Sequence, residues 1–263
     1  MLTDAQRKAR EGKLTASRVG VLMRGDAEAV MQLWLELSGQ APEKDLSNIW
    51  AVRLGETTEQ LHLDWLQETL GYVITRRGEV VTHNDYPWAA CTLDGWHDGM
   101  PIEAKHCNGH EPVEVIIERY QPQVQWTMFV TRAREAAITI IQGAREPNNG
   151  SKPNFVDRDD AYIEEMVRRS RQFMFFVRCG EPPVVLPPVP APINAQREID
   201  MTGNETWKRQ AEQWLQVHGA AEVARDCEKV LKKLVPDDAR KASGHGIRIT
   251  RDRAGRLSLR AEE

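Results

Sequence analysis

The sequence predicts an α/β fold, with a central mixed sheet flanked by helices and a C-terminal module of helices and a β-hairpin. Segments with helical periodicity alternate with short β-type runs from residue 15 to residue 177. A proline-rich stretch then interrupts the pattern, and the remaining chain shows helical and then alternating periodicity. The 263 residues, 41% hydrophobic and 28% charged, suffice for a large domain with its own core and an appendage.

The first three helices are predicted from capping residues and apolar spacing. Residues 15–23 read as a short helix opened by a Thr or Ser cap, and Asp26 caps a second helix that stops at Gly39. A third helix is expected over 47–70, because Gly71 stands where a left-handed residue commonly ends a helix. One face of this helix carries a carboxylate followed by leucines: Glu59, Leu63, Leu66 and Leu70.

Short β-type runs come next and predict a small antiparallel meander. Turn residues separate the runs, which are 72–75, 79–82, 88–93 and 101–105. A helix over 120–130, a buried strand over 136–142 and a helix over 160–177 follow. Pro122 is expected to break the start of the helix in which it stands.

Proline content sets the predicted domain boundaries. Six prolines in 181–192 favour an extended, semi-rigid linker. The predicted parts are a core, a linker and a C-terminal module: 1–180, 181–193 and 194–263. The module is expected to contain two helices and a hairpin: 205–218, 220–234 and 246–260.

Net charge, hydropathy and cysteine spacing limit the partners and the cellular compartment that we expect for this protein. The net charge is −4, so positive charge must be local, and seven Lys or Arg against one Asp lie between residues 240 and 260. These cations could bind phosphate, or they could only keep an edge strand from pairing, and the sequence favours neither. Apolar runs fall short of the roughly 18 residues of a membrane span. We therefore expect a cytoplasmic protein without a membrane partner, its four dispersed cysteines reduced.

The residues that indicate chemistry lie in the window 91–105. In a strand, Glu103 and Lys105 point to the same face, about 6.6 Å apart, and their apolar neighbours point to the other. Asp94 ends the preceding run, and an antiparallel neighbour lies roughly 4.8 Å away, so Asp94 can approach Glu103. Two carboxylates that close raise each other's pKa unless a cation neutralises them.

Oxygen ligands without clustered His or Cys favour a hard cation. Mg²⁺ takes one or two carboxylates together with waters and phosphate oxygens. Glu59 offers a third carboxylate, because burying it unpaired on a leucine face would be costly. Lys105 could hold or deprotonate an attacking water, or stabilise charge growing on phosphorus.

Simpler interpretations of the same residues stay open. Asp-Gly is a common turn, and Glu-x-Lys on an exposed strand is usually a solvated pair worth little. A transition-metal site is conceivable in the segment 106–110, which contains His106, Cys107 and His110, although such groups in a loop are more often bystanders. Trp96 could stack on a base, whereas most tryptophans should lie in the core.

Five short motifs occur in an order that is informative as a set. They are Leu14-Thr15-Ala16-Ser17, Gly55-x-x-x-Glu59, Cys91-x-x-Asp94-Gly95, Ile102-Glu103-Ala104-Lys105 and Tyr120-x-x-Gln123-Val124-Gln125-Trp126. With them, residues 5–180 resemble the lambda-exonuclease or YqaJ-like phage recombinase branch of the PD-(D/E)xK nuclease superfamily. The resemblance implies a restriction-endonuclease-like core and a Mg²⁺-dependent deoxyribonuclease, with Mn²⁺ as a substitute. Such enzymes commonly degrade double-stranded DNA ends from the 5′ side for recombination.

The resemblance also implies roles for individual residues. Asp94, Glu103 and the Ala104 carbonyl would hold magnesium, Glu59 would serve a second metal or its water, and Lys105 would activate the nucleophile. Gln123 matches a glutamine near the scissile phosphate, and Tyr120 a neighbouring DNA-binding position. Arg10 and Ser17 match residues that grip a terminal 5′-phosphate. One departure is Asn84, which stands where the exonucleases carry an acidic residue, with Asp85 beside it.

Partners and alternatives follow from the same resemblance. A ring-shaped homo-oligomer around duplex DNA is implied, and a single-strand annealing protein is a possible partner. One alternative function is a structure- or sequence-directed endonuclease. Another is a non-catalytic DNA-binding or scaffold protein, which should lack a member of the metal site, yet all four are present: Glu59, Asp94, Glu103 and Lys105.

Overall fold

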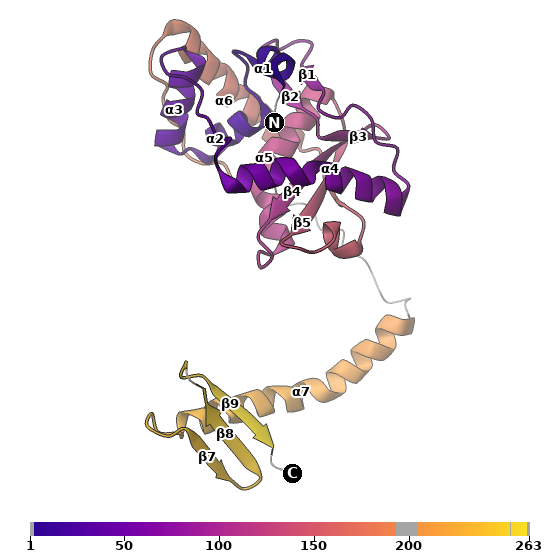
Figure 1. The fold of residues 1–263 in the computed structure, drawn as a ribbon, viewed down its shortest axis with the longest axis vertical. Coiled ribbons are helices and arrows are strands. Elements are labelled where there is room, and N and C mark those ends of the chain that lie inside the picture. The colour runs from indigo at the N-terminus through magenta and orange to yellow at the C-terminus, as the bar shows by residue number, and fades with distance from the viewer. Residues whose placement is uncertain (1–2, 193–204, 253, 262–263) are drawn as a thin grey trace. The chain divides into compact units, whose positions relative to one another are not determined.

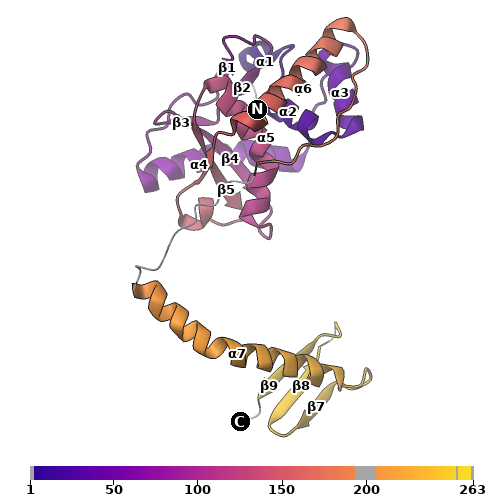
Figure 2. The same ribbon diagram turned by 180° about the vertical axis from the view of Figure 1, so that it is seen from behind.

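The computed structural model describes residues 3–192, 205–252 and 254–261 (Figures 1 and 2). The chain forms two compact units, Met1–Gln196 and Arg197–Glu263, and each is described by itself. The end of the predicted linker and the start of the predicted C-terminal module, 193–204, lie outside the described residues.

A four-stranded mixed sheet is the centre of the first unit. Strands β4 and β5 run parallel, and each outer strand is antiparallel to its neighbour. In sheet order the strands are β3 (Gly95–His97), β4 (Met100–Cys107), β5 (Glu135–Gln142) and β6 (Asn154–Asp157). The predicted fold class is thereby confirmed.

Two helices cover opposite faces of this sheet, as Figure 1 shows with α4 (Trp50–Leu70) in front and α5 (Val113–Thr131) behind. Ala137 of β5 packs with the leucines of α4, whereas Ile138 packs against α5. Because alternate residues of a strand face opposite sides, β5 is buried on both faces.

The other helices of the first unit agree with their sequence signals. Asp26 accepts hydrogen bonds from the backbone N–H groups of Glu28 and Ala29, and Gly71 ends α4 with φ +71°. The remaining elements are α1 (Asp4–Arg10), α2 (Ala16–Arg24), α3 (Ala27–Leu37), β1 (Val80–Thr82), β2 (Ala90–Thr92), the 3-10 helix η1 (Pro147–Gly150) and α6 (Asp160–Cys179). None of the helices in the described ranges is long and apolar enough to cross a membrane.

The predicted single meander is wrong. Residues 72–75 form no strand and contribute only an isolated bridge between Thr75 and Trp96. β1 and β2 pair as a separate two-stranded sheet, and β3 forms within the segment predicted as a turn. The left-handed residues Asp98 and Gly99 allow the chain to reverse in so short a space.

The expectation that Pro122 breaks its helix is also wrong. Pro122 lies inside α5, which begins at Val113. A proline removes one N–H donor, here the partner of the Glu118 carbonyl. Because Glu118 is exposed, water can satisfy that carbonyl.

The proline-rich stretch packs against the helices of the first unit. The Val189 N–H donates to the Met23 carbonyl at 2.9 Å, and Arg169 donates to the Pro187 carbonyl at 2.7 Å. Gly25 permits this approach, because a Cβ there would lie 2.5 Å from the Leu186 carbonyl oxygen. Over 181–192 the chain has no helix or strand.

The C-terminal unit has one helix where two were predicted. α7 (Glu205–Lys233) continues through Gly219, since a glycine only weakens a helix at this position. The predicted hairpin is confirmed as β8 (Ile247–Arg251) and β9 (Leu257–Ala261), and β7 (Lys241–Gly244) adds a third antiparallel strand. Arg253 lies outside the described residues.

Candidate active site

Strand β4 positions the central pair of the site. Ile102 packs with the leucines of α4, so the alternation of the strand turns Glu103 and Lys105 toward α5. The Lys105 Nζ atom lies 2.5 Å from Glu103 Oε1, and the side chains are only 16% and 7% exposed. Such a pair is costly to break, because removing one partner leaves a buried charge unpaired.

Asp94 joins this pair through the backbone of β4. It stands just before β3, the antiparallel neighbour of β4, and its Oδ2 atom accepts a 2.8 Å hydrogen bond from the Ala104 N–H. The N–H and C=O groups of a strand residue point to the same side, so the Ala104 carbonyl also faces the Asp94 side. Gly95 is needed here, because a Cβ would lie 2.9 Å from Ile74 Cγ2.

Helix α5 supplies the opposite wall. The Gln123 Nε2 atom donates a hydrogen bond to Glu103 Oε1, which fixes the orientation of that carboxylate. Lys105 Nζ lies 4.9 Å from the centre of the Tyr120 ring, within the range of a cation–π contact. Tyr120 therefore stands beside the lysine, and its predicted contact with DNA stays a prediction.

The pKa directions show that the carboxylates crowd one another. Burial, then Glu103, raises the pKa of Glu59, which α4 contributes. The same two causes raise the pKa of Asp94 well above its usual range. Burial alone would lower the pKa of Lys105, but Glu103 and Asp94 outweigh it and raise that pKa. Lys105 therefore keeps its proton, and one ammonium faces three carboxyl groups.

This donor set fits a hard divalent cation without forming a complete cage. Within the described ranges, no three His, Cys, Asp or Glu side chains are spaced to hold an ion by themselves. Mg²⁺ commonly takes one or two protein carboxylates and completes its shell with waters and phosphate oxygens. Asp94, Glu103 and the Ala104 carbonyl offer such a partial shell, and a cation there would offset both burial and the Glu103 charge, which together raise the pKa of Asp94.

The transition-metal alternative finds no support in the described part of the chain. His106 Nδ1 lies 3.3 Å from Thr58 Oγ1, and Cys107 is buried in an apolar cluster.

Asp85, which follows Asn84 in the sequence, forms an exposed ion pair with Arg132 at 2.8 Å. No described contact joins Asp85 to the carboxylate cluster.

Trp96 is a packing residue of the first unit. It is partly buried against two apolar clusters, and the Arg76 guanidinium lies 4.8 Å from its ring. A contact of this kind occupies one face of the ring. The interpretation of Trp96 as a core residue thus describes the structure better than the base-stacking one.

Sequence reasoning missed His62, one turn beyond Glu59 on α4. His62 is 1% exposed, and its Nδ1 atom lies 3.2 Å from Thr139 Oγ1 on β5. Burial, then His106 and Lys105, lowers the pKa of His62 to about 3, so the ring is neutral. Its Nε2 atom is buried without a described partner. The spacing from Glu59 on a leucine-lined face is the signal that could have identified it.

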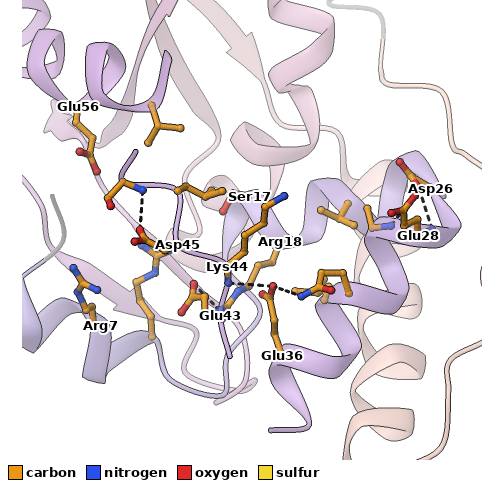
Figure 3. A pocket seen from close by; sticks show the side chains of 18 residues that line it. Arg7, Ser17, Arg18, Asp26, Glu28, Glu36, Glu43, Lys44, Asp45 and Glu56 are labelled. Carbon is orange, nitrogen blue, oxygen red and sulfur yellow. Dashed lines mark hydrogen bonds and ion pairs between the residues drawn. The ribbon is translucent and has the colours of Figure 1, made fainter. Parts of the chain in front are cut away.

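A cavity lies among the N-terminal helices (Figure 3). This cavity has a volume of about 870 Å³, and its walls include both predicted 5′-phosphate residues, Arg10 and Ser17. Glu56 also lines it, one turn before Glu59 on α4. The cavity and the carboxylate cluster therefore share one helix.

Arg10 and Arg18, two cations of the cavity, differ in their contacts. Arg18 forms a 2.9 Å ion pair with Glu43, whereas Arg10 has no ion pair among the described residues and only a long, 3.5 Å contact to Thr15 Oγ1. Burial, then the Arg18 charge, lowers the pKa of Arg10. Thr15 begins α2 without a described side-chain bond to the first turn, so the N–H groups of that turn, which includes Ser17, have no side-chain cap.

Comparison with known proteins shows a family resemblance and a shared fold. Residues 7–134 match the family model of the YqaJ-like viral recombinase domain, which confirms the predicted resemblance. The crystal structure of an alkaline exonuclease, LHK-Exo, from Laribacter hongkongensis is similar with a TM-score of 0.56 and 21% identity. The crystal structure of its complex with dAMP is similar with a TM-score of 0.57 and 22% identity. Both cover 68% of this chain and 94% of that chain, and they show the fold. No curated protein matches this chain.

Proposed function

We propose that this protein is a divalent-metal-dependent deoxyribonuclease that degrades duplex DNA ends in the 5′-to-3′ direction during phage-type recombination. The observation that carries the proposal is the buried convergence of Asp94, Glu103 and Lys105. The YqaJ-like domain and the exonuclease-like fold support it. The proposed setting is the cytoplasm of a bacterial or phage-infected cell.

Asp94, Glu103 and the Ala104 carbonyl would hold Mg²⁺, and Mn²⁺ would substitute. A bound divalent ion would polarise the scissile phosphate and lower the pKa of an attacking water. Glu59, whose pKa is raised by burial and then by Glu103, would orient that water or help to hold a second ion. These roles need only oxygen ligands, which is the donor chemistry that the cluster offers.

Lys105 would act as a cation and hydrogen-bond donor. Its raised pKa keeps the ammonium charged, so it suits an attacking water or a phosphoryl oxygen that gains negative charge. Gln123 would hold Glu103 in one orientation and approach the scissile phosphate. Tyr120 would confine the ammonium from the other side and border the DNA.

Arg10 and Ser17 would bind the terminal 5′-phosphate. The support is a half-buried guanidinium without an ion pair in the described structure, together with the start of α2, whose first turn has no side-chain cap. A phosphate would supply a direct ion-pair partner. Capture of a 5′-phosphate near the metal site would favour exonuclease over endonuclease action.

Digestion of linear, nicked and closed circular duplexes with Mg²⁺ tests this function. We expect loss of linear DNA, survival of closed circles, and no activity when EDTA replaces the metal. Cutting of closed circles would instead support the endonuclease alternative. A 5′-labelled and a 3′-labelled duplex then give the polarity, since 5′-to-3′ digestion releases the 5′ label first.

Assembly is a separate part of the proposal. A homo-oligomeric ring around duplex DNA and a single-strand annealing partner rest on the family resemblance alone. Light scattering of the full chain would give the oligomer number, and a monomer that digests DNA processively would contradict the ring.

A further inference from the structure

The three-stranded sheet of the C-terminal unit has two unlike faces. One face is apolar: Ile249 is 4% exposed, and Ala242 and Leu259 stand opposite it in register. Ile247 and Leu257, two residues away along the strands, are half-buried on the same face. Only this face contributes to the core of the unit.

The other face, which we call the open sheet face, is polar and exposed. Its members occupy the alternate positions of the strands: Lys241, Ser243, Arg248, Thr250, Ser258 and Arg260. It therefore presents three cations and three hydroxyl groups. No Asp or Glu occurs in the described residues of β7, β8 or β9.

The positions of the cations indicate which of them could protect a strand edge and which could not. Arg248 and Arg260 stand directly opposite each other, and like charges at such positions destabilise a sheet. Lys241 and Arg260 lie on the outer strands, where a charge can prevent pairing with other chains. Arg248 lies on the central strand β8, which has no free edge, so edge protection gives it no role.

We propose that the open sheet face binds the phosphodiester backbone of DNA, as a second contact apart from the active site. The proposal rests on the proposed function, which makes DNA the polyanion that this chain meets. Lys, Arg, Ser and Thr side chains are the usual donors to phosphate oxygens. The strands carry no aromatic residue for stacking on bases, so the contact is independent of sequence. A duplex and a single strand share this backbone chemistry.

Anisotropy titrations with the full chain test the proposal. A Lys241→Thr/Arg248→Thr/Arg260→Thr variant keeps strand-forming residues, and Lys208→Thr/Arg209→Thr/Lys233→Thr removes the same charge from exposed positions of α7. Labelled duplex and single-stranded DNA are titrated in EDTA between about 50 and 200 mM salt. We expect the sheet variant to bind roughly 10- to 100-fold more weakly, with a salt slope smaller by about 1 for each phosphate that it no longer neutralises. The α7 variant should change affinity far less.

Each result decides for or against the proposal. Weaker binding to one DNA form identifies that form as the ligand, and weaker binding to both supports a shared backbone contact. Equal affinities of the sheet and α7 variants for both forms would overturn the proposal. If the triple variant fails to fold, Arg248→Glu alone takes its place, with an expected loss of about fivefold or more and Lys233→Glu as its control. No loss with Arg248→Glu would equally overturn it.

Cleavage by the same proteins separates this proposal from the proposed function. At saturating DNA, the sheet variant should cut at the wild-type rate. If the wild-type protein binds DNA through the sheet but cuts no DNA form, the proposed function fails and the binding site stands. If cutting is normal and the sheet variant binds like wild type, only the second contact fails.

Discussion

The two compact units use charge in opposite ways. In the first unit, Glu103 and Lys105 are nearly buried and bonded to each other. In the second unit, Arg248 and Arg260 are exposed on an open face, and the 29-residue helix α7 has no buried residue. Buried charged groups hold a few reacting atoms in fixed positions, whereas a face of exposed cations can bind along a long polyanion. Catalysis and additional DNA affinity should therefore be separable by mutation.

The largest expected effect is on cleavage. Glu103→Gln should reduce the cleavage rate about 10³-fold, because it removes a metal-binding charge from the site. DNA affinity in EDTA should change little, since the substitution lies outside the proposed binding surfaces. Single-turnover digestion of a linear duplex gives the rate, with Glu118→Gln, an exposed position of α5, as the control. Normal cleavage by Glu103→Gln would remove this residue from the mechanism.

Stability should depend far more on the core of the first unit than on α7. Leu66 is fully buried, so Leu66→Ala should lower the free energy of unfolding by roughly 2–5 kcal/mol. Leu215 of α7 is 66% exposed, and Leu215→Ala should change the free energy of unfolding by less than about 0.5 kcal/mol. Denaturant unfolding measures both. Equal losses would show that α7 buries Leu215 in solution.

The 5′-phosphate proposal predicts a selective effect. Arg10→Gln should raise KM about 10-fold or more for duplexes with a 5′-phosphate, because the substitution removes a charge-assisted hydrogen bond to that phosphate. For duplexes with a 5′-hydroxyl, KM should stay the same. Lys44→Gln, which removes another cation that lines the cavity, is the control. An equal rise for both kinds of end would contradict a phosphate-specific role.

The smallest expected effect is on acid stability. Arg168, as the largest influence, and Arg169 lower the pKa of Glu165 to about 2 and outweigh burial, which alone would raise it. A lowered folded-state pKa stabilises the protein above the unfolded value of about 4.5 and loses that contribution as pH falls toward about 2. Glu165→Gln should thus flatten the fall of Tm between about pH 5 and pH 3 by a small amount. Glu164→Gln, at an exposed neighbouring position, should leave the fall unchanged.

Local patterns predicted the helix that Asp26 caps and the orientation of the central pair of the site. Asp26 caps its helix through its own side chain, and the strand alternation that separates Ile102 from Glu103 is the observed one. Both depend on neighbours in sequence, which a single chain reveals. The prediction of a single meander was wrong because β3 is short and the pairing of β4 with β5 is non-local.

Other features could not be predicted from the sequence, for separate reasons. His62 contacts Thr139, 77 positions away, and no periodicity encodes that pairing. The continuity of α7 through Gly219 reflects a modest helix penalty that a breaker rule overstates. Strand spacing predicted the approach of Asp94 to β4, and the leucine face around Glu59 predicted a third carboxylate, whereas the family motifs added their individual roles.

The most direct test of the central claim is single-turnover cleavage of a 5′-phosphorylated linear duplex by Asp94→Asn, with Mg²⁺ varied. Asp98→Asn is the control, since Asp98 is exposed in the turn between β3 and β4 and Asn tolerates its left-handed backbone. We predict that Asp94→Asn loses cleavage at every Mg²⁺ concentration while Asp98→Asn retains it. Wild-type cleavage by Asp94→Asn would contradict the assignment of this cluster as the nuclease site.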